Sequence, residues 1–157
     1  MRIIALTNQK GGVAKTTSTM NIGAALAQLN KKVLLVDLDP QHNLTVSLGI
    51  PAHELDKTIY DLLKKTAQPD EVIIHRKSFD VLPASLRLSA ADMELSNIPG
   101  REFLLKETIS TIEGYDFILL DSPPSLGMLT LSAIPAAQEI FIPLQTHFLQ
   151  LQGIRML

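Results

Sequence analysis

The sequence contains no cysteine and no tryptophan, and only 4% of its 157 residues are aromatic. The lack of cysteine excludes disulfides and thiolate metal sites, and it is typical of a protein of the reducing cytosol. No apolar run approaches the roughly 18 residues that a membrane-spanning helix requires, so we expect no membrane association and no signal peptide. The 14 basic and 16 acidic residues give a net charge of −2. Any contact with nucleic acid must therefore come from a local patch or from an assembly.

The most informative segment is a glycine-containing loop that directly follows an apolar stretch at residues 2–7. Backbone N–H groups of such a turn point inward and bind phosphate, and a helix that begins there favours an anion. Lys15 would supply a positive charge to the β- and γ-phosphates, and Thr16 a hydroxyl ligand for Mg²⁺. The residues predicted to contact a nucleotide are Lys10, Gly11, Gly12, Val13, Ala14, Lys15, Thr16 and Thr17.

The loop departs from the general phosphate-loop pattern at two positions. That pattern has glycine at its first position and before the lysine, where this chain carries Gln9 and Ala14. Alanine fits position 14 only with a negative φ, which is what we expect there. The alternative interpretation is a plain glycine turn between a strand and a helix. It is disfavoured because a lysine at a helix N-terminus is unfavourable unless it holds an anion.

Apolar segments without alternation recur along the chain and are typical of strands that are buried on both faces. They alternate with segments that predict helices. The predicted strands cover residues 2–7, 32–37, 115–121 and 139–144, and the predicted helices cover 16–29, 101–112 and 126–137. This alternation predicts an α/β fold with a mostly parallel, doubly wound sheet.

The middle and the end of the chain are less regular. The segments expected there are short helices at 58–65 and 90–96, short strands at 72–75 and 79–82, and the beginning of a helix at 148–157. The length suffices for one domain with a hydrophobic core, so we predict a single phosphate-loop domain over residues 1–157. Because the predicted strands make only a partial nucleotide-binding sheet, we expect the C-terminal part of this domain to be missing.

Three acids lie at or just past the ends of predicted parallel strands, which is the edge of such a sheet where ligands bind. We predict that Asp37 and Asp121 support Mg²⁺ together with Thr16, and that Asp39 orients the attacking water. The alternative for each single acid is a role in a turn or a helix cap. The four histidines show no metal-ligand spacing, and His42 is the one that lies just after the turn near the expected phosphates.

These segments together resemble the ParA/Soj branch of the deviant-Walker ATPases. Residues 8–17 read NQKGGVAKTT, which is similar to the family's NQKGGVGKTT. Residues 33–41, VLLVDLDPQ, with Asn43 and Thr45, resemble the family's second motif. Residues 115–127, YDFILLDSPPSLG, resemble its Walker B strand and the loop that follows. The resemblance spans almost the whole chain.

The resemblance implies a P-loop ATPase that binds ATP and Mg²⁺, hydrolyses ATP weakly to ADP and phosphate, and forms a homodimer when ATP is bound. Lys10 would then be the signature lysine that reaches the partner's nucleotide, and the implied catalytic residues are Lys10, Lys15 and Asp39. The resemblance further implies plasmid or chromosome partition, non-specific DNA binding by the dimer, and a centromere-binding partner of the ParB type. It also implies a cytoplasmic, nucleoid-associated protein.

Two other functions stay open at this point. A MinD-like membrane-cycling ATPase needs a C-terminal amphipathic helix, and no such segment is visible, while the sequence Asp39-Pro40-Gln41 favours the partition branch. The second alternative is a non-catalytic interaction module that binds nucleotide or a partner without hydrolysis. Two features favour it: Ala14 stands in place of the family's glycine, and the chain ends where family members continue. His42 also departs from the family, which usually has a small residue at this position.

Overall fold

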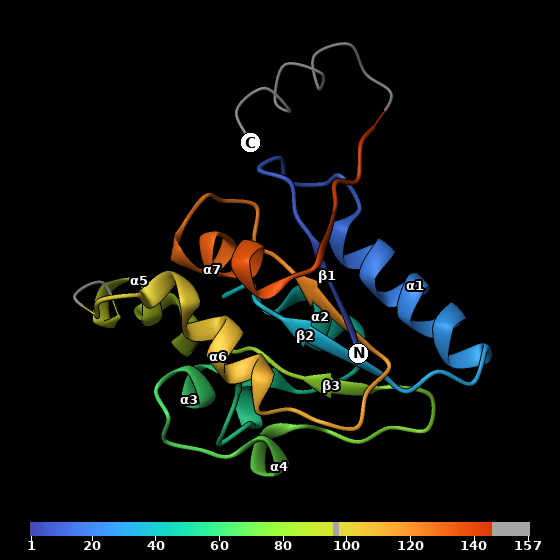
Figure 1. The fold of residues 1–157 in the computed structure, drawn as a ribbon, viewed down its shortest axis with the longest axis horizontal. Helices are drawn as coiled ribbons and strands as arrows, with labels where there is room; N and C mark the ends of the chain where they lie inside the picture. The colour runs from blue at the N-terminus through green and yellow to red at the C-terminus, as the bar shows by residue number, and fades with distance from the viewer. Residues whose placement is uncertain (96–97, 146–157) are drawn as a thin grey trace.

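The computed structural model describes residues 1–95 and 98–145 of the chain. Its centre is a sheet of five strands in the spatial order β3-β2-β4-β1-β5, and all four neighbouring pairs are parallel (Figure 1). The strands are β1 Arg2–Leu6, β2 Val33–Asp37, β3 Asp80–Leu82, β4 Phe117–Asp121 and β5 Glu139–Phe141. The predicted α/β fold with a parallel sheet is confirmed.

Helices lie on both sides of this sheet (Figure 1). The α-helices are α1 Lys15–Gln28, α2 Asn43–Ser47, α3 Ile59–Leu63, α4 Pro69–Val72, α5 Ala91–Glu94, α6 Leu104–Ser110 and α7 Met128–Ala136. Three short 3₁₀ helices are η1 Ala52–Glu54, η2 Leu86–Ala90 and η3 Arg101–Phe103. Within the described ranges, no helix has the length and apolar character that crossing a membrane would require.

Successive side chains of each strand enter two different cores, as the two-residue repeat of a strand requires. On one face, Ile3 and Ala5 of β1 pack with buried residues of α3, α6 and α7. On the other face, Ile4 and Leu6 pack with Leu35 of β2 and with the inner side of α1. The sheet is thus the middle of three layers, which explains why its central strands are apolar without alternation.

The structure corrects several of the expected elements. The prediction of a strand at 72–75 is wrong: Val72 is the last residue of the short helix α4, and the strand-like pairing described after it is an isolated antiparallel bridge between Ile74 and Val81. Proline at the first position of α4 favours this helix start. The predicted helix at 101–112 is divided into η3 and α6. The short helices α2 and η1 were not predicted, and the expected helix at 148–157 lies outside the described residues.

Helix α1 approaches the sheet very closely at one glycine. A Cβ atom placed on Gly23 would lie 2.6 Å from Cδ2 of Leu35, which is fully buried in β2. That distance is shorter than a van der Waals contact, so either the helix or the leucine would have to shift. Glycine at this position is therefore a packing requirement, and it fixes how α1 and the loop before it sit on the sheet.

We expect Gly23→Ala to destabilise the folded chain by about 1–2 kcal/mol, because overpacking a core contact outweighs the better helix propensity of alanine. The measurement is the free energy of unfolding from denaturant titration. The reverse change at an exposed position of the same helix, Ala25→Gly, measures the propensity effect alone and should cost about 1 kcal/mol. A Gly23→Ala chain as stable as the wild type would show that α1 does not need this close approach.

Candidate phosphate-binding site

A cavity of about 430 Å³ lies at the carboxyl edge of the sheet. There the loop that joins β1 to α1 faces the ends of β2 and β4 (Figure 1). Six of the eight residues predicted to contact a nucleotide line this cavity, whereas Lys10 and Val13 do not. The lining residues are Gly11, Gly12, Ala14, Lys15, Thr16, Thr17, Met20, Asp39, Asn43, Ser47, Ser122 and Pro124.

The loop reaches α1 through two residues in the left-handed region of backbone space. Gly12 has φ of 72°, and Ala14 has φ of 67° with ψ of 28°. The expectation of a negative φ at Ala14 is therefore wrong: the turn into the helix needs a left-handed residue where the general pattern has glycine. For a residue with a Cβ this conformation costs on the order of 1–2 kcal/mol. Ala14 thus keeps the shape of the phosphate loop at the expense of local strain.

The first turn of α1 is open toward the cavity. Ala14 provides no side-chain cap, and the first turn contains no acidic residue. The first backbone bond of the helix runs from Ser18 N to Ala14 O at 2.8 Å, so the N–H groups of residues 15–17 project from the helix end. Together with the helix dipole they form a site that favours an anion. Val13 is buried beneath the loop and anchors it.

Lys15 extends back under the loop. Its side chain is only 7% exposed, and Nζ donates to the carbonyl oxygens of Asn8 at 2.9 Å and Lys10 at 3.1 Å. Burial lowers the pKa of the ammonium group, while the carboxylates of Asp121 and Asp39 act in the opposite direction. A buried lysine of this kind is favourable only when anions lie close to it.

Lys10 lies on the outside of the loop. Its side chain is exposed, and none of the ion pairs found among residues 1–95 and 98–145 involves it. Its backbone N–H donates to Oδ1 of Asn8 at 3.0 Å, which holds the entrance of the loop. The lysine predicted as the signature residue is therefore exposed and does not line its own cavity.

Asp121 at the end of β4 is joined to the first turn of α1. Oγ1 of Thr16 donates to its Oδ2 at 2.7 Å, and Oγ1 of Thr19 lies 3.4 Å from its Oδ1. Burial raises the pKa of Asp121 to about 7; the Thr16 hydrogen bond opposes this rise, and the nearby carboxylates of Asp37 and Asp39 add to it. The two predicted magnesium ligands, Thr16 and Asp121, therefore lie in contact. In the part of the chain that the structure describes, no three His, Cys, Asp or Glu side chains form a ready-made metal cluster.

Asp37, the third predicted magnesium residue, points into the protein. Its Oδ2 accepts hydrogen bonds from the backbone N–H of Thr45 at 2.8 Å and from the Thr45 hydroxyl at 2.7 Å, and its Oδ1 accepts from Asp39 N at 3.0 Å. The residue is 0% exposed, and burial raises its pKa to about 6 against the effect of the Thr45 bonds. In this arrangement Asp37 fixes the path of residues 38–45. Its role in holding magnesium stays a prediction.

Asp39 comes from the loop that Asp37 organises, and it lines the cavity. Its Oδ1 accepts from the backbone N–H of Gln41 at 2.9 Å, and its Oδ2 accepts from Nδ2 of Asn43 at 3.3 Å. These bonds hold the carboxylate in one orientation toward the phosphate loop. His42 turns away instead: its Nδ1 lies 3.0 Å from the carbonyl oxygen of Pro40, and the residue does not line the cavity.

The segment after β5 fastens the loop from its other side. Nδ2 of Asn8 donates to the carbonyl oxygen of Pro143 at 2.9 Å, and Nε2 of Gln145 donates to that of Gly12 at 2.8 Å. The loop is thus held between α1 on one side and the edge of β5 on the other.

Sequence reasoning gave no role at the site to five residues, although four of them lie in the segments that resemble the family; the five are Thr19, Asn43, Thr45, Ser122 and Pro124. Thr19 had a usable signal, because it lies three residues after Thr16 on the same side of α1. Ser122 and Pro124 directly follow Asp121 in a segment whose likeness to a Walker B strand was noted. Nothing in the sequence indicated that Thr45 would bind Asp37.

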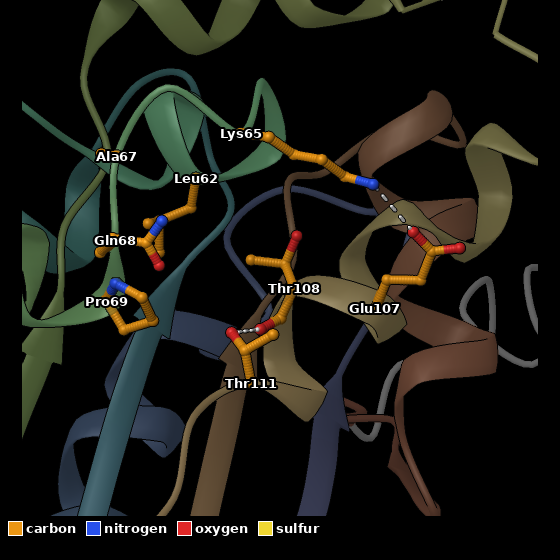
Figure 2. A pocket seen from close by; sticks show the side chains of 8 residues that line it. All are labelled: Leu62, Lys65, Ala67, Gln68, Pro69, Glu107, Thr108 and Thr111. Carbon is orange, nitrogen blue, oxygen red and sulfur yellow. Dashed lines mark hydrogen bonds and ion pairs between the residues drawn. The ribbon is translucent and has the colours of Figure 1, made fainter.

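A second hollow of about 390 Å³ lies between the turn that follows α3 and helix α6 (Figure 2). Lys65 and Glu107 point toward one another at its mouth and form an ion pair at 3.3 Å, with both side chains exposed. Oγ1 of Thr111, which directly follows α6, donates to the backbone carbonyl oxygen of Thr108 at 2.8 Å. The charged groups of this second hollow, Lys65 and Glu107, are exposed to solvent. The lysine and the carboxylates beside the phosphate loop are buried instead. The phosphate loop is therefore the stronger candidate site.

Comparison with known proteins places this geometry in a family. A family model described as an AAA domain matches residues 1–157. The sporulation initiation inhibitor protein Soj of Bacillus subtilis (strain 168) is 43% identical over 159 residues, which cover 99% of this chain and 63% of that protein. The chromosome-partitioning ATPase Soj of Treponema pallidum (strain Nichols) is 46% identical over 161 residues, which cover 99% of this chain and 62% of that protein.

The fold is also similar to a solved structure that contains nucleotide. The crystal structure of cobyrinic acid a,c-diamide synthase from Mycobacterium smegmatis, with a bound ATP analogue and magnesium, matches with a TM-score of 0.93 and 40% sequence identity. The match covers 99% of this chain and 66% of that one. The chain spans 63% and 62% of the two curated Soj proteins, or about three-fifths of their length. The AAA-domain model matches the whole chain, and the two Soj proteins are 43% and 46% identical to it. The chain therefore belongs to the ParA/Soj-type family of P-loop ATPases.

Proposed function

We propose that the chain binds ATP with Mg²⁺ and acts as a nucleotide-dependent dimerisation switch in plasmid or chromosome partition. The observation that carries this proposal is one constellation: an uncapped α1 N-terminus beside a buried Lys15 and the hydrogen-bonded pair of Thr16 and Asp121. An uncapped helix N-terminus and a buried lysine both favour an anion such as a phosphate chain. The hydroxyl and carboxylate of the Thr16–Asp121 pair are oxygen ligands of the kind that a divalent cation takes.

In this proposal the phosphate chain lies along the loop. The backbone N–H groups of residues 12–17 hold the α- and β-phosphates, and Lys15 contacts the β- and γ-phosphates. The buried position of Lys15 supports this assignment. Its ammonium group donates to two backbone carbonyl oxygens, and a charged phosphate oxygen would be a stronger acceptor.

The residues present also fit Mg²⁺. The hydroxyl of Thr16 and the carboxylate of Asp121 are the hard oxygen donors that this ion prefers, with phosphate oxygens and waters to complete six ligands. The site contains three buried carboxylates and one buried ammonium group, that of Lys15; the carboxylates are those of Asp37, Asp39 and Asp121. A divalent cation would offset the excess negative charge. The bound ion would neutralise charge that develops on the phosphate oxygens during hydrolysis.

Hydrolysis requires a water molecule in line with the bond that breaks. We assign Asp39 to orient this water, because its carboxylate lines the cavity and is held by Gln41 and Asn43. The oxygen of the water bonds to the γ-phosphorus, the bond between that phosphorus and the β–γ bridging oxygen breaks, and ADP and phosphate result. Lys15 would stabilise the charge on the transferred group.

Dimerisation would bring the cavities of two copies face to face. The exposed Lys10 supports this arrangement, because it lies at the entrance of the phosphate loop and does not line the cavity of its own subunit. Across the interface it would meet the partner's nucleotide, and a buried cation–phosphate contact is of the strong, charge-assisted kind. Loss of the γ-phosphate removes part of the charge that each Lys10 contacts, so hydrolysis would release the dimer.

DNA and a ParB-type protein complete the proposed cycle as partners of the ATP-bound dimer, in the cytoplasm at the nucleoid. The support is the resemblance of the sequence motifs to the partition branch, together with a relative that is 46% identical and is named a chromosome-partitioning ATPase. Because the net charge of the chain is −2, bulk electrostatics do not attract it to DNA. Contact with DNA would therefore require a local basic surface or the remaining length that the relatives possess.

A second candidate function is nucleotide binding without turnover, as an interaction module. The left-handed Ala14 favours it, since strain in the phosphate loop reduces the affinity that the loop offers. The two candidates differ in phosphate release: a switch releases phosphate from ATP with Mg²⁺, and a binding module does not.

The dimerisation mechanism predicts that Lys10→Ala still binds a non-hydrolysable ATP analogue with Mg²⁺ but no longer dimerises. Truncating one partner of a buried charge pair costs about 2–5 kcal/mol, so the dimer should weaken by at least about thirtyfold. Light scattering gives the mass and calorimetric titration the nucleotide affinity. Lys31→Ala, which removes another exposed lysine, is the matched control and should dimerise normally. Equal dimerisation of the Lys10 and Lys31 variants would contradict this role of Lys10.

Relief of loop strain predicts that Ala14→Gly stabilises the nucleotide-free chain by up to about 1 kcal/mol and tightens nucleotide binding. Glycine adopts the left-handed conformation without a steric cost, although its greater freedom in the unfolded chain cancels part of the gain. Thermal unfolding and nucleotide titration measure the two effects. Ala25→Gly, within the right-handed part of α1, should instead destabilise. Were Ala14→Gly to destabilise by a similar amount, the strain would be disproved.

The raised pKa of Asp121 predicts that the nucleotide-free, metal-free chain becomes less stable as the pH rises from about 4 to 7. The folded state binds this proton more tightly than the unfolded state does, so its contribution to stability is complete below pH ~4 and is lost by pH ~7. Asp121→Asn should reduce the slope of unfolding free energy against pH by up to about 1.4 kcal/mol per pH unit. The exposed Asp56→Asn serves as the control. An unchanged slope in Asp121→Asn would refute the assignment.

A further inference from the structure

Four exposed cations gather at the amino edge of the sheet, at the opposite ends of the strands from the phosphate cavity. Because the strands are parallel, the segments that lead into β2, β3 and β4 all lie at this edge (Figure 1). Lys31 and Lys32 directly precede β2, and Arg76 and Lys77 lie in the segment before β3. These four residues are called the basic edge below.

The basic edge is hollowed. Lys31, Lys32 and Arg76 line a hollow of about 410 Å³, together with Ser78 and the residues just before β4. A second hollow, of about 350 Å³, is lined by Arg76 and Lys77 and shares Ser78 with the first. The four cations therefore border one continuous concave surface.

The cations of the basic edge differ from others on the surface because they have no acidic partner. Five other surface cations form ion pairs, and these are Arg2, Lys57, Lys64, Lys65 and Arg87. Among the pairs formed within residues 1–95 and 98–145, none includes a member of the basic edge. The positive charge of this surface is thus available to an external anion.

The acid nearest to Arg76 is already engaged by the protein. Oδ2 of Asp80 accepts a hydrogen bond from the Tyr115 hydroxyl at 2.6 Å and lies 2.8 Å from Nδ1 of His75. Its Oδ1 accepts from Arg76 N at 3.1 Å. Asp80 therefore fixes the backbone of the segment before β3 and leaves the guanidinium group of Arg76 exposed.

The segment before β2 is held in a similar way. Lys32 N donates to Oδ2 of Asp116 at 2.9 Å, and Asp116 N donates to Lys32 O at 2.8 Å. Glu113 also lines the hollow and supplies one opposing charge. The basic edge thus presents mobile cationic side chains from a backbone that hydrogen bonds hold in place.

The residues around the hollow favour duplex DNA as the anion. Lysine, arginine and serine bind the phosphate oxygens of a duplex without reading its sequence. Single strands bind to exposed aromatic rings, but Phe79 packs against the core and the half-buried Tyr115 is bound to Asp80. Insertion into a membrane surface needs exposed apolar side chains, and both Val33 and Phe79, which line the hollow, pack in the core.

We propose that the basic edge binds the phosphate backbone of duplex DNA. This inference rests on the proposed function, because it assigns a surface to the DNA partner named there. The net charge of −2 does not oppose it, since the four cations lie together at one edge. In the proposed dimer the phosphate cavities face each other, so the two basic edges would lie at the far ends of the subunits and stay open to DNA.

The test is fluorescence anisotropy of a labelled DNA duplex, titrated with the chain in AMP-PNP and Mg²⁺ at several salt concentrations. The triple variant Lys31→Ala, Lys32→Ala and Lys77→Ala should bind at least about tenfold more weakly at about 0.1 M salt. Its slope of log affinity against log salt should fall by about 2–3, because each lost phosphate contact removes about 0.9. Arg76 is left unchanged, because its guanidinium group also donates to the carbonyl oxygen of Leu48.

The matched control removes the same charge from lysines that are in ion pairs. The triple variant Lys57→Ala, Lys64→Ala and Lys65→Ala should bind the duplex like the wild type. Arginine at all three substituted positions of the basic edge keeps the charge and should restore binding. Calorimetric titration with AMP-PNP should give wild-type affinity for every variant, since none of the substituted residues lines the phosphate cavity, and this result also shows that the variants fold.

Three results would overturn the DNA surface. They are equal weakening in the two alanine variants, a wild-type chain that does not bind the duplex, and a basic-edge variant that loses binding to vesicles of anionic phospholipid but keeps binding to the duplex. A wild-type chain that binds the duplex through the basic edge but does not bind AMP-PNP would overturn the proposed ATP switch instead, which is a different result.

Discussion

The register between β2 and β4 is the constraint on which the site depends. Both strands are apolar and fully or almost fully buried, so they end at the same level of the sheet, with Asp37 directly opposite Asp121. Each strand thus delivers a carboxyl group into a region of low dielectric, where the two residues are 0% and 1% exposed. Neighbouring buried carboxylates raise one another's pKa and cannot both ionise without partners. The ionised carboxylates can be stabilised by hydroxyl donors, by the ammonium group of Lys15 or by an external cation.

Asp37 and Asp121 have different hydrogen-bond partners, and the difference decides which carboxylate is fully engaged within the protein. Thr45, at the start of α2, gives Asp37 both a backbone and a side-chain hydrogen bond, so this carboxylate is engaged within the protein. Its third bond, from Asp39 N, sets the direction of the loop that carries Asp39 into the cavity. Asp121 has instead the hydroxyl of Thr16 and a longer contact, and it keeps a pKa of about 7. Asp37 thus fixes the loop that carries Asp39, and Asp121 is the carboxylate that the proposed function assigns to Mg²⁺.

Local sequence predicted those parts of the molecule that depend on short-range rules. The buried parallel strands, the phosphate loop and the pairing of Thr16 with Asp121 at one edge follow from apolar runs and from fixed spacing. The left-handed Ala14 was not predicted, because the fold overrides the preference of a residue with a Cβ when both ends of a turn are fixed. The role of Thr45 depends on its hydrogen bonds to Asp37, eight residues earlier across an irregular turn, which periodicity does not report. The strand expected at 72–75 did not form, because α4 ends only at Val72 and Ile74 then makes a single antiparallel bridge with Val81.

The unfavourable features of the nucleotide-free chain gather around one cavity. They are the strained Ala14, the uncapped first turn of α1 and the raised pKa of Asp121. They belong to three separate segments: the phosphate loop, α1 and the end of β4. A ligand that binds only the folded state stabilises that state in proportion to its affinity, and here it would also join the three segments to one another.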